Sequence, residues 1–208
     1  MGFPTDLALA TRNPGKVREI LEICSSWPVN WHVRTDQSDP SGFPRNWPEV
    51  EETGETYLEN ARLKAHVVAG ALGLPAIGED SGIEVDALGD EPGPRSARYA
   101  GPHPTDAENL ELLIAKVRPM PPESRTARYR CVAVCAWPDG REVWAEGDCE
   151  GTLIVKPRGK GGFGYDPVFV PAGERRTMAE LSPEEKNTLS HRAKALRALG
   201  EILSRSSP

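Results

Sequence analysis

The stretch TYLENARLKAHVVAGALGLPAIGEDSGIEV, residues 56–85, decides the fold class. Its first half places apolar residues at helical spacing, so we expect a helix from Thr56 to Leu72 that stops at Gly73. Its second half predicts a strand at 75–78 and an alternating strand at 83–86. The segment 79–82, Glu-Asp-Ser-Gly, is expected at the mouth of a strand, where open α/β sheets bind ligands. A solvated turn is the alternative for that segment.

Upstream of this stretch, the chain opens as a strand, a loop and a helix. Residues 7–10 (LALA) are expected to form a buried strand, 11–15 (TRNPG) a turn, and Lys16 to Ile23 a helix. A second strand is predicted at 31–35. Residues 36–54 are rich in Pro, Ser and acidic residues, which is typical of a loop.

Downstream, paired strands dominate the pattern. The helix that starts at Thr105 carries a capping box with Glu108. The other expected elements are a loop at 89–104, strands at 126–137 and 142–150 joined at 138–140, a glycine-rich loop at 159–164, and a last helix from Glu184 to about Leu203 opened by Ser182-Pro183. Helices and strands alternate early and strands pair later, so we predict a mixed-sheet α/β fold, one domain over residues 1–208.

Composition narrows the classes of function. The 208 residues carry a net charge of −6, whereas a nucleic-acid-binding surface normally shows a basic excess. No window approaches a membrane span and no signal peptide is indicated, so a cytoplasmic location is expected. The four cysteines form no CxxC pair, which favours buried free thiols over a zinc site.

Two polar segments are suited to phosphate chemistry. The loop 11–16 (TRNPGK) leads from a strand into a helix, which presents backbone N–H groups and Lys16 to an anion. An ordinary Asn-Pro-Gly turn is the alternative. The acids at 79–80 and a second acidic loop, Glu51-Glu52-Thr53-Gly54, offer the carboxylate oxygens that Mg²⁺ prefers together with substrate phosphate.

Two further segments are suited to holding a nucleobase. The loop 161–167 (GGFGYDP) sets aromatic rings among glycines, which predicts a ring laid on a flat ligand, or else aromatic anchors that pack the loop down. The helix start 184–192 (EEKNTLSHR) brings Lys186, His191 and Arg192 to one end of the last helix. A solvated amphipathic helix is the alternative.

These segments occur together and in order, and the chain resembles the inosine triphosphate pyrophosphatase family, also called dITP/XTP pyrophosphatases. The resemblance rests on ATRNPGKVREI (10–20), ETGETYLENARLKA (52–65), GEDSGIEVDALGDEPGPRSARYAG (78–101), GKGGFGYDPVF (159–169) and EEKNTLSHRAKAL (184–196). It implies an elongated two-lobed fold with a central nucleotide-binding cleft, and a homodimer. It also implies Mg²⁺-dependent hydrolysis of ITP, dITP and XTP to the monophosphate and pyrophosphate, as house-cleaning of the nucleotide pool.

The resemblance also assigns residues. It implies Glu51 and Asp80 as metal ligands, Asp80 as the catalytic proton acceptor, and Ser81 as a substrate contact. The implied phosphate loop is Thr11, Arg12, Asn13, Pro14, Gly15 and Lys16, and the implied base and sugar contacts are Phe163, Gly164, Tyr165 and Asp166. Lys186 is implied to contact phosphate or groups near the base, and His191 and Arg192 to recognise the base. Arg12 departs from the small residue that the family often has there, which bears on the detail of the phosphate contacts.

The chemistry adds two expectations and leaves two rivals. A carboxylate bound to Mg²⁺ has a lowered pKa and is a weak base, so Glu79 or Glu51 is the alternative to Asp80 for orienting the water. Donors from His191 or Arg192 favour the O6 acceptor of hypoxanthine and xanthine over the 6-amino group of adenine. The rivals are a septum-inhibitor-type pyrophosphatase for modified pyrimidines and a non-catalytic nucleotide- or RNA-binding module.

Overall fold

The computed structural model describes residues 2–34 and 47–205. Its elements, in chain order, are β1 Asp6–Leu9, α1 Pro14–Ile23, β2 Asn30–Val33, α2 Tyr57–Leu72, β3 Ala76–Val85, β4 Glu91–Pro92, α3 Asp106–Val117, β5 Thr126–Ala136, β6 Glu142–Leu153, β7 Phe169–Pro171, α4 Pro183–Leu189 and α5 His191–Arg205. Short 3-10 turns lie at Asp86–Leu88, Gly93–Arg98, Pro122–Ser124 and Met178–Glu180. The part of the predicted loop 36–54 that precedes residue 47 lies outside the described residues, as does Thr35.

The strands of the described chain form a seven-stranded mixed sheet in the order β2-β1-β3-β5-β6-β7, with β4 paired to β3. β1 runs parallel to β2 and β3, whereas β4 is antiparallel to β3 and β7 to β6. The predicted mixed-sheet α/β class is therefore confirmed. The predicted partners β5 and β6 are neighbours in the sheet.

The chain divides into two compact units and passes between them within β3, β5, β6 and α5. The first unit comprises residues 1–80, 132–146 and 195–208, and the second comprises 81–131 and 147–194. The expectation of one two-lobed domain over residues 1–208 stays a prediction. The elongated outline, the cleft and the action of both units as one catalytic domain stay predictions.

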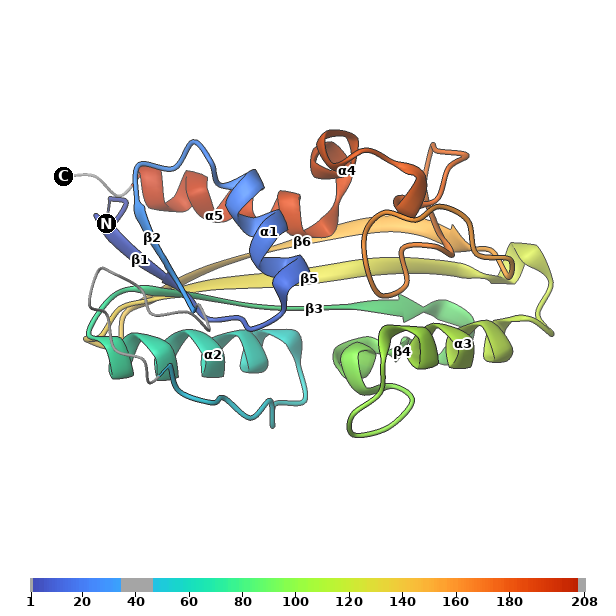
Figure 1. Ribbon diagram of the computed structural model, residues 1–208, viewed down its shortest axis with the longest axis horizontal. Helices are drawn as coiled ribbons and strands as arrows, with labels where there is room; N and C mark the ends of the chain where they lie inside the picture. The colour runs from blue at the N-terminus through green and yellow to red at the C-terminus, as the bar shows by residue number, and fades with distance from the viewer. Residues whose placement is uncertain (1, 35–46, 206–208) are drawn as a thin grey trace. The chain divides into compact units, whose positions relative to one another are not determined.

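In the first unit, α2 lies on one face of the strands and α1 on the other (Figure 1). Thr56 and Glu59 form a capping box at the start of α2, and Gly73 ends it in the left-handed region at φ 66°. Small residues let α2 approach the sheet closely: a Cβ on Gly78 of β3 would lie 2.3 Å from the Ala61 carbonyl oxygen. This contact sets the α2 side chains next to β3.

The second unit has its own apolar core. Ile83 and Val85 of β3 pack with residues of α3, β5, β6 and β7, among them Leu113, Tyr129 and Phe169. The predicted capping box of Thr105 and Glu108 begins α3. The unit therefore buries a continuous set of side chains beneath the glycine-rich loop.

Three expectations about the elements are wrong. The segment 79–82 is no strand mouth, because β3 runs unbroken through Glu79, Asp80 and Ser81. The loop expected at 89–104 contains β4 and the 3-10 turn Gly93–Arg98. The last helix is two helices, because Ser190 is extended at ψ 150° and its Oγ accepts from the N–H of Ala193. Ser190 thereby ends α4 and caps α5.

Candidate functional site

The loop that joins β1 to α1 is organised by its own side chains. Asn13 caps α1, and its Oδ1 accepts from the N–H groups of Gly15 at 2.9 Å and Lys16 at 3.1 Å. Pro14 occupies the first helical turn, where its missing N–H costs no helical bond. The N–H of Asn13 donates to Thr11 Oγ1 at 3.3 Å, and Arg12 pairs with Glu49. An incoming phosphate would therefore compete with Asn13 and Glu49 for the donors of this loop.

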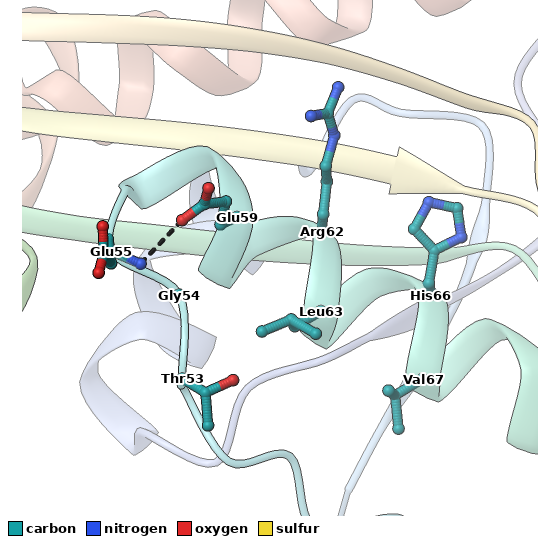
Figure 2. A pocket seen from close by; sticks show the side chains of 8 residues that line it. All are labelled: Thr53, Gly54, Glu55, Glu59, Arg62, Leu63, His66 and Val67. Carbon is teal, nitrogen blue, oxygen red and sulfur yellow. Dashed lines mark hydrogen bonds between the residues drawn. The ribbon is translucent and has the colours of Figure 1, made fainter.

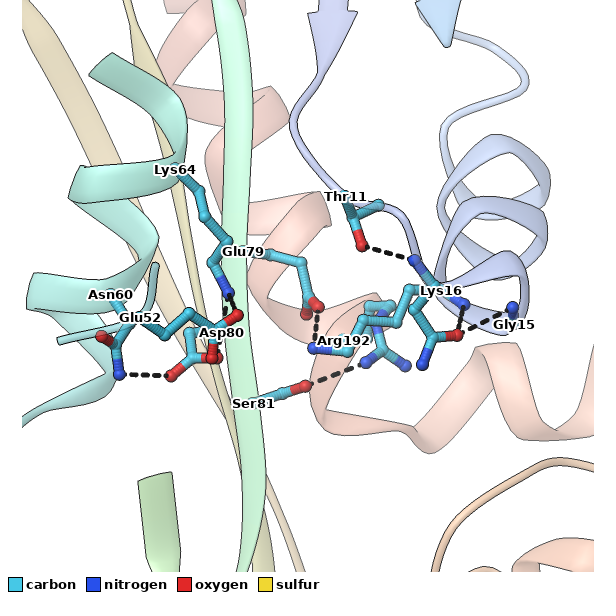
Figure 3. A network of polar contacts seen from close by, with 11 residues as sticks. Thr11, Gly15, Lys16, Glu52, Asn60, Lys64, Glu79, Asp80, Ser81 and Arg192 are labelled. Carbon is cyan, nitrogen blue, oxygen red and sulfur yellow. Dashed lines mark hydrogen bonds and ion pairs between the residues drawn. The ribbon is translucent and has the colours of Figure 1, made fainter. Parts of the chain in front are cut away.

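Two lysines neutralise the adjacent acids of β3 in the first unit (Figure 3). Lys16 Nζ lies 2.6 Å from Glu79 Oε1, and Lys64 Nζ lies 3.1 Å from Asp80 Oδ1. The side chains of Glu79 and Asp80 are 0% and 5% exposed. Buried carboxylates persist only with such partners, so β3 carries two acids through its centre because α1 and α2 supply cations.

Asp80 is further held by Asn60, four residues before Lys64 on α2. Asn60 Nδ2 donates to Asp80 Oδ2 at 3.3 Å, while its Oδ1 accepts from the N–H of Gly54 at 2.8 Å. Gly54 lies two residues after Glu52, whose Oε1 accepts from Lys64 Nζ at 2.8 Å. The amide of Asn60 thus fastens the acidic loop to the same strand position. We name Glu52, Asn60, Lys64, Asp80 and the pair Lys16–Glu79 the carboxylate–lysine cluster.

Burial and charge act in opposite directions in this cluster. Burial raises the pKa of Asp80 above its ordinary value, against the opposing effect of Lys64 and Lys16. Burial also opposes the charged form of Lys64, but Asp80, Glu52 and Glu79 outweigh it and raise the pKa of that ammonium. Lys64 therefore stays protonated.

The structure brings Glu52 to the cluster, whereas Glu51 is exposed. Sequence reasoning named Glu52 only as part of the acidic loop 51–54, and it missed Asn60 and Lys64. One signal for the last two was present: Asn60 and Lys64 share a helical face with the apolar Ala61 and Ala65, and polar residues on such a face need buried partners.

The donor chemistry of the cluster fits Mg²⁺. The described residues contain no group of three or more His, Cys, Asp or Glu placed to hold a metal. Mg²⁺ does not require one, because it is usually bound through one or two carboxylates, several waters and substrate phosphate. Asp80 and Glu52 supply two carboxylates with hard oxygen donors, and both carboxylates contact the ammonium of Lys64.

The second unit gathers the predicted base-binding residues around Asp166. Asp166 is 3% exposed, and its Oδ2 accepts from Lys186 Nζ at 2.6 Å and from the N–H of Phe163 at 3.0 Å. The Phe163 ring has Lys186 Nζ 5.2 Å and the Arg192 guanidinium carbon 5.6 Å from its centroid. Both cations are thus close enough for cation–π interactions with this ring.

Arg192, which is predicted to recognise the base, is almost fully buried, at 2% exposure. Its Nη2 donates to Ser81 Oγ at 3.0 Å (Figure 3). His191 precedes it at the start of α5 and is 4% exposed. Both residues directly follow the break at Ser190 and belong to the second unit.

Two residues that are predicted to contact base and sugar hold the glycine-rich loop in place through hydrogen bonds. Tyr165 is 5% exposed and its hydroxyl donates to the Ser96 carbonyl at 2.7 Å. The N–H of Gly164 donates to Asp106 Oδ2 at 2.9 Å, at the start of α3. Aromatic anchoring, the alternative reading of this loop, therefore holds for Tyr165. A pocket of about 250 Å³ lies beside Phe163 and Gly164.

Another pocket, of about 500 Å³, lies along the outer side of α2 (Figure 2). Arg62 and His66 border it and bind Glu142 of β6 at 2.7 and 2.8 Å. Leu63 and Val67 contribute its apolar lining. None of the residues predicted to bind substrate or metal lines this pocket.

Comparison with known proteins identifies the family. The sequence model of the Ham1 family matches residues 7–202. The chain belongs to the Ham1 family. It is 49% identical over 199 residues to a dITP/XTP pyrophosphatase of Streptomyces coelicolor, covering 96% of this chain and 97% of that protein.

Solved structures of Ham1 proteins share the fold. A HAM1 protein from Coxiella burnetii superposes with a TM-score of 0.84 at 36% identity, covering 98% of this chain and all of that one. The nucleoside-triphosphatase / dITP/XTP pyrophosphatase from Mycobacterium abscessus gives a TM-score of 0.71 at 41% identity, covering 93% of this chain and 98% of that one. The family match therefore includes the carboxylate–lysine cluster and the residues around Asp166.

The structure also bears on the cysteines and on the search for membrane-spanning helices. All four cysteines are buried and none forms a disulfide; burial raises the pKa of Cys24 and Cys135 to about 12. The prediction of buried thiols is confirmed. Within the described residues, no helix is both long and apolar enough to cross a membrane.

Proposed function

We propose that this Ham1 chain is a nucleotide pyrophosphatase that hydrolyses the non-standard purine nucleotides ITP, dITP and XTP to the monophosphate and pyrophosphate, and so cleanses the nucleotide pool. The support from relatives is their name, dITP/XTP pyrophosphatase, at up to 49% identity over nearly the full length. The observation that carries the proposal is the buried carboxylate–lysine cluster, where Asp80 and Glu79 each meet a lysine. Phosphoryl chemistry needs both charges at one place.

In this mechanism a water attacks the α-phosphorus, the bond from that phosphorus to the bridging oxygen breaks, and pyrophosphate leaves. Lys16 and Lys64 stabilise the negative charge on the phosphoryl oxygens. Asp80 orients the water and accepts its proton, for which a pKa raised by burial is favourable. Lys16 binds phosphate by exchanging its partner Glu79 for the substrate.

We include Mg²⁺ as cofactor, which Asp80 and Glu52 would hold together with the substrate. When bound, it neutralises phosphate charge and polarises the attacked phosphorus. Glu51, assigned this place by the resemblance, is the alternative ligand. Because metal binding weakens Asp80 as a base, Glu79 is the alternative group for the water.

For the base, we assign recognition to Arg192 and His191 at the start of α5, with Phe163 as the stacking ring. Guanidinium and imidazole N–H groups donate to O6 of hypoxanthine or xanthine. Adenine presents a donor there, so its complex leaves buried donors unpaired. Selectivity from such a mismatch reaches about 10⁴-fold or more.

A phosphate-release assay tests the proposal. ITP, XTP, ATP and a modified pyrimidine triphosphate are each incubated with the protein, with and without Mg²⁺ and with and without inorganic pyrophosphatase. We expect phosphate from ITP and XTP only when both Mg²⁺ and the coupling enzyme are present. Equal turnover of ATP would refute the base assignment, and phosphate release without the coupling enzyme would refute pyrophosphate as product.

The same assay separates the rivals. A septum-inhibitor-type enzyme would prefer the modified pyrimidine, and a binding module would bind ITP without turnover. We also propose a homodimer in the cytoplasm, on the strength of the family resemblance; sedimentation equilibrium at micromolar concentration tests the dimer.

A further inference from the structure

Tyr129 is a buried residue of β5 that makes two directional contacts with the base-recognition residues. It is 7% exposed and lies within the second unit. Its ring stacks on the His191 imidazole, with centroids 4.6 Å apart and planes inclined by only 7°. The ring of Phe169 also packs against it, with centroids 4.7 Å apart and planes inclined by 62°. The imidazole is therefore laid flat on a ring that the core holds.

The hydroxyl of Tyr129 reaches a different element. It donates to Asp166 Oδ1 at 3.2 Å, while Oδ2 of the same carboxylate accepts from Lys186 Nζ and from the N–H of Phe163. The hydrogen bond of Tyr129 therefore fixes the rotation of the Asp166 carboxylate. That carboxylate in turn holds the start of the glycine-rich loop and the lysine of α4.

We propose that Tyr129 is the positioning residue for base recognition, an inference that rests on the proposed function. One rigid side chain aligns the imidazole of His191 through its ring and the loop of Phe163 through its hydroxyl. A β-strand residue locked by core packing suits this role, because recognition groups must be held within a fraction of an ångström. Tyr129 itself is not placed against the substrate.

The ring and the hydroxyl can be tested separately. Tyr129→Leu removes both, whereas Tyr129→Phe keeps the stack and removes only the bond to Asp166. Phe169→Leu is the matched control, because it removes an aromatic ring that packs against Tyr129 in the same core and leaves the Tyr129–His191 stack and the bond to Asp166 in place. Each variant is measured for kcat and KM with ITP and ATP, and by NMR for the imidazole proton shifts of His191.

We expect Tyr129→Leu to lower the ITP-to-ATP ratio of kcat/KM by about tenfold or more, since small misplacements of a recognition group cost up to about 100-fold. Its His191 protons should move downfield as ring-current shielding is lost. Phe169→Leu should keep the ratio within about twofold, as expected for a loss of stability alone. Tyr129→Phe should keep the His191 shift and raise KM for ITP more than it lowers kcat.

An unchanged ratio in Tyr129→Leu, or an equal loss in Phe169→Leu, would overturn the inference. If Tyr129→Leu does not fold, Tyr129→Phe decides, because a wild-type KM for ITP in that variant overturns the role of the hydroxyl. If the wild-type protein itself fails to favour ITP over ATP, the proposed function has failed. The NMR shift of the His191 protons then still tests the alignment, because this measurement needs no substrate. An unchanged His191 shift in Tyr129→Leu would overturn the proposed alignment by Tyr129.

Discussion

Replacing Lys64 by methionine tests the electrostatic balance of the carboxylate–lysine cluster. The substitution keeps the aliphatic stem within α2 and removes an ammonium that contacts Asp80 at 3.1 Å and Glu52 at 2.8 Å. The side chains of Lys64 and Asp80 are 9% and 5% exposed, so water cannot replace the lost partner. Breaking a buried ion pair from one side costs about 3–5 kcal/mol.

The lower end of that range applies here. Asn60 still donates to Asp80 and Lys16 still favours its charged form, so part of the compensation for the buried carboxylate remains at pH 8. We therefore expect a loss of about 3 kcal/mol in the free energy of unfolding at pH 8. That corresponds to an equilibrium constant for unfolding higher by about 100-fold.

The pH dependence has a definite sign. A carboxyl whose folded-state pKa is raised contributes stability below its unfolded pKa, and that contribution is lost as the pH rises through the folded value. Asp80 is such a group, more strongly so in Lys64→Met than in the wild type. The difference in stability between wild type and Lys64→Met should therefore narrow from pH 8 to pH 5.

Urea unfolding followed by tryptophan fluorescence measures both quantities. Arg205→Met is the control, because it breaks an ion pair to Glu201 whose side chains are 78% and 67% exposed. Exposed pairs of this kind contribute little. The reasoning is refuted if Lys64→Met is as stable as Arg205→Met at pH 8, or if its loss of stability is the same at pH 5 and pH 8.

Three further substitutions probe the chemistry, the loop and the base reader. Asp80→Asn keeps the size but not the charge, and should lower pyrophosphate release by at least about 100-fold, the loss typical for a general base; near-normal hydrolysis would remove Asp80 from the mechanism. Gly162→Ala places a Cβ 2.0 Å from Asp166 Oδ2, so thermal unfolding should show a loss at least about 1 kcal/mol larger than Gly164→Ala, whose φ is equally positive but whose Cβ meets nothing within 4 Å. Arg192→Met should reduce the ITP-to-ATP ratio of kcat/KM by about tenfold or more, and a retained ratio would assign base reading elsewhere.

The elements were predictable where a local signal was complete. The helix at Thr56–Leu72 has a periodic apolar face and a terminating glycine, and α3 has both halves of a capping box in its first turn. The break at Ser190 was missed for a physical reason. Nothing in residues 184–203 prevents a continuous helix, and Ser190 becomes a cap where Lys186 binds the buried Asp166 and Arg192 binds Ser81, both within the second unit.

The wrong prediction of a strand end at residues 79–82 also comes from contacts that are distant in sequence. Two adjacent acids in an apolar strand conflict with burial when only neighbours in sequence are considered, so Glu79 and Asp80 were assigned to the end of a strand. Their compensation comes from Lys16 of α1 and Lys64 of α2, which are 63 and 16 residues away along the chain. The helix positions follow from packing: Gly78 admits α2 close to β3, and only then does Lys64 reach Asp80. An acid pair that is costly in isolation is thus stable only in a chain that also builds these two helices, which ties the folding of the first unit to the charges that its proposed chemistry needs.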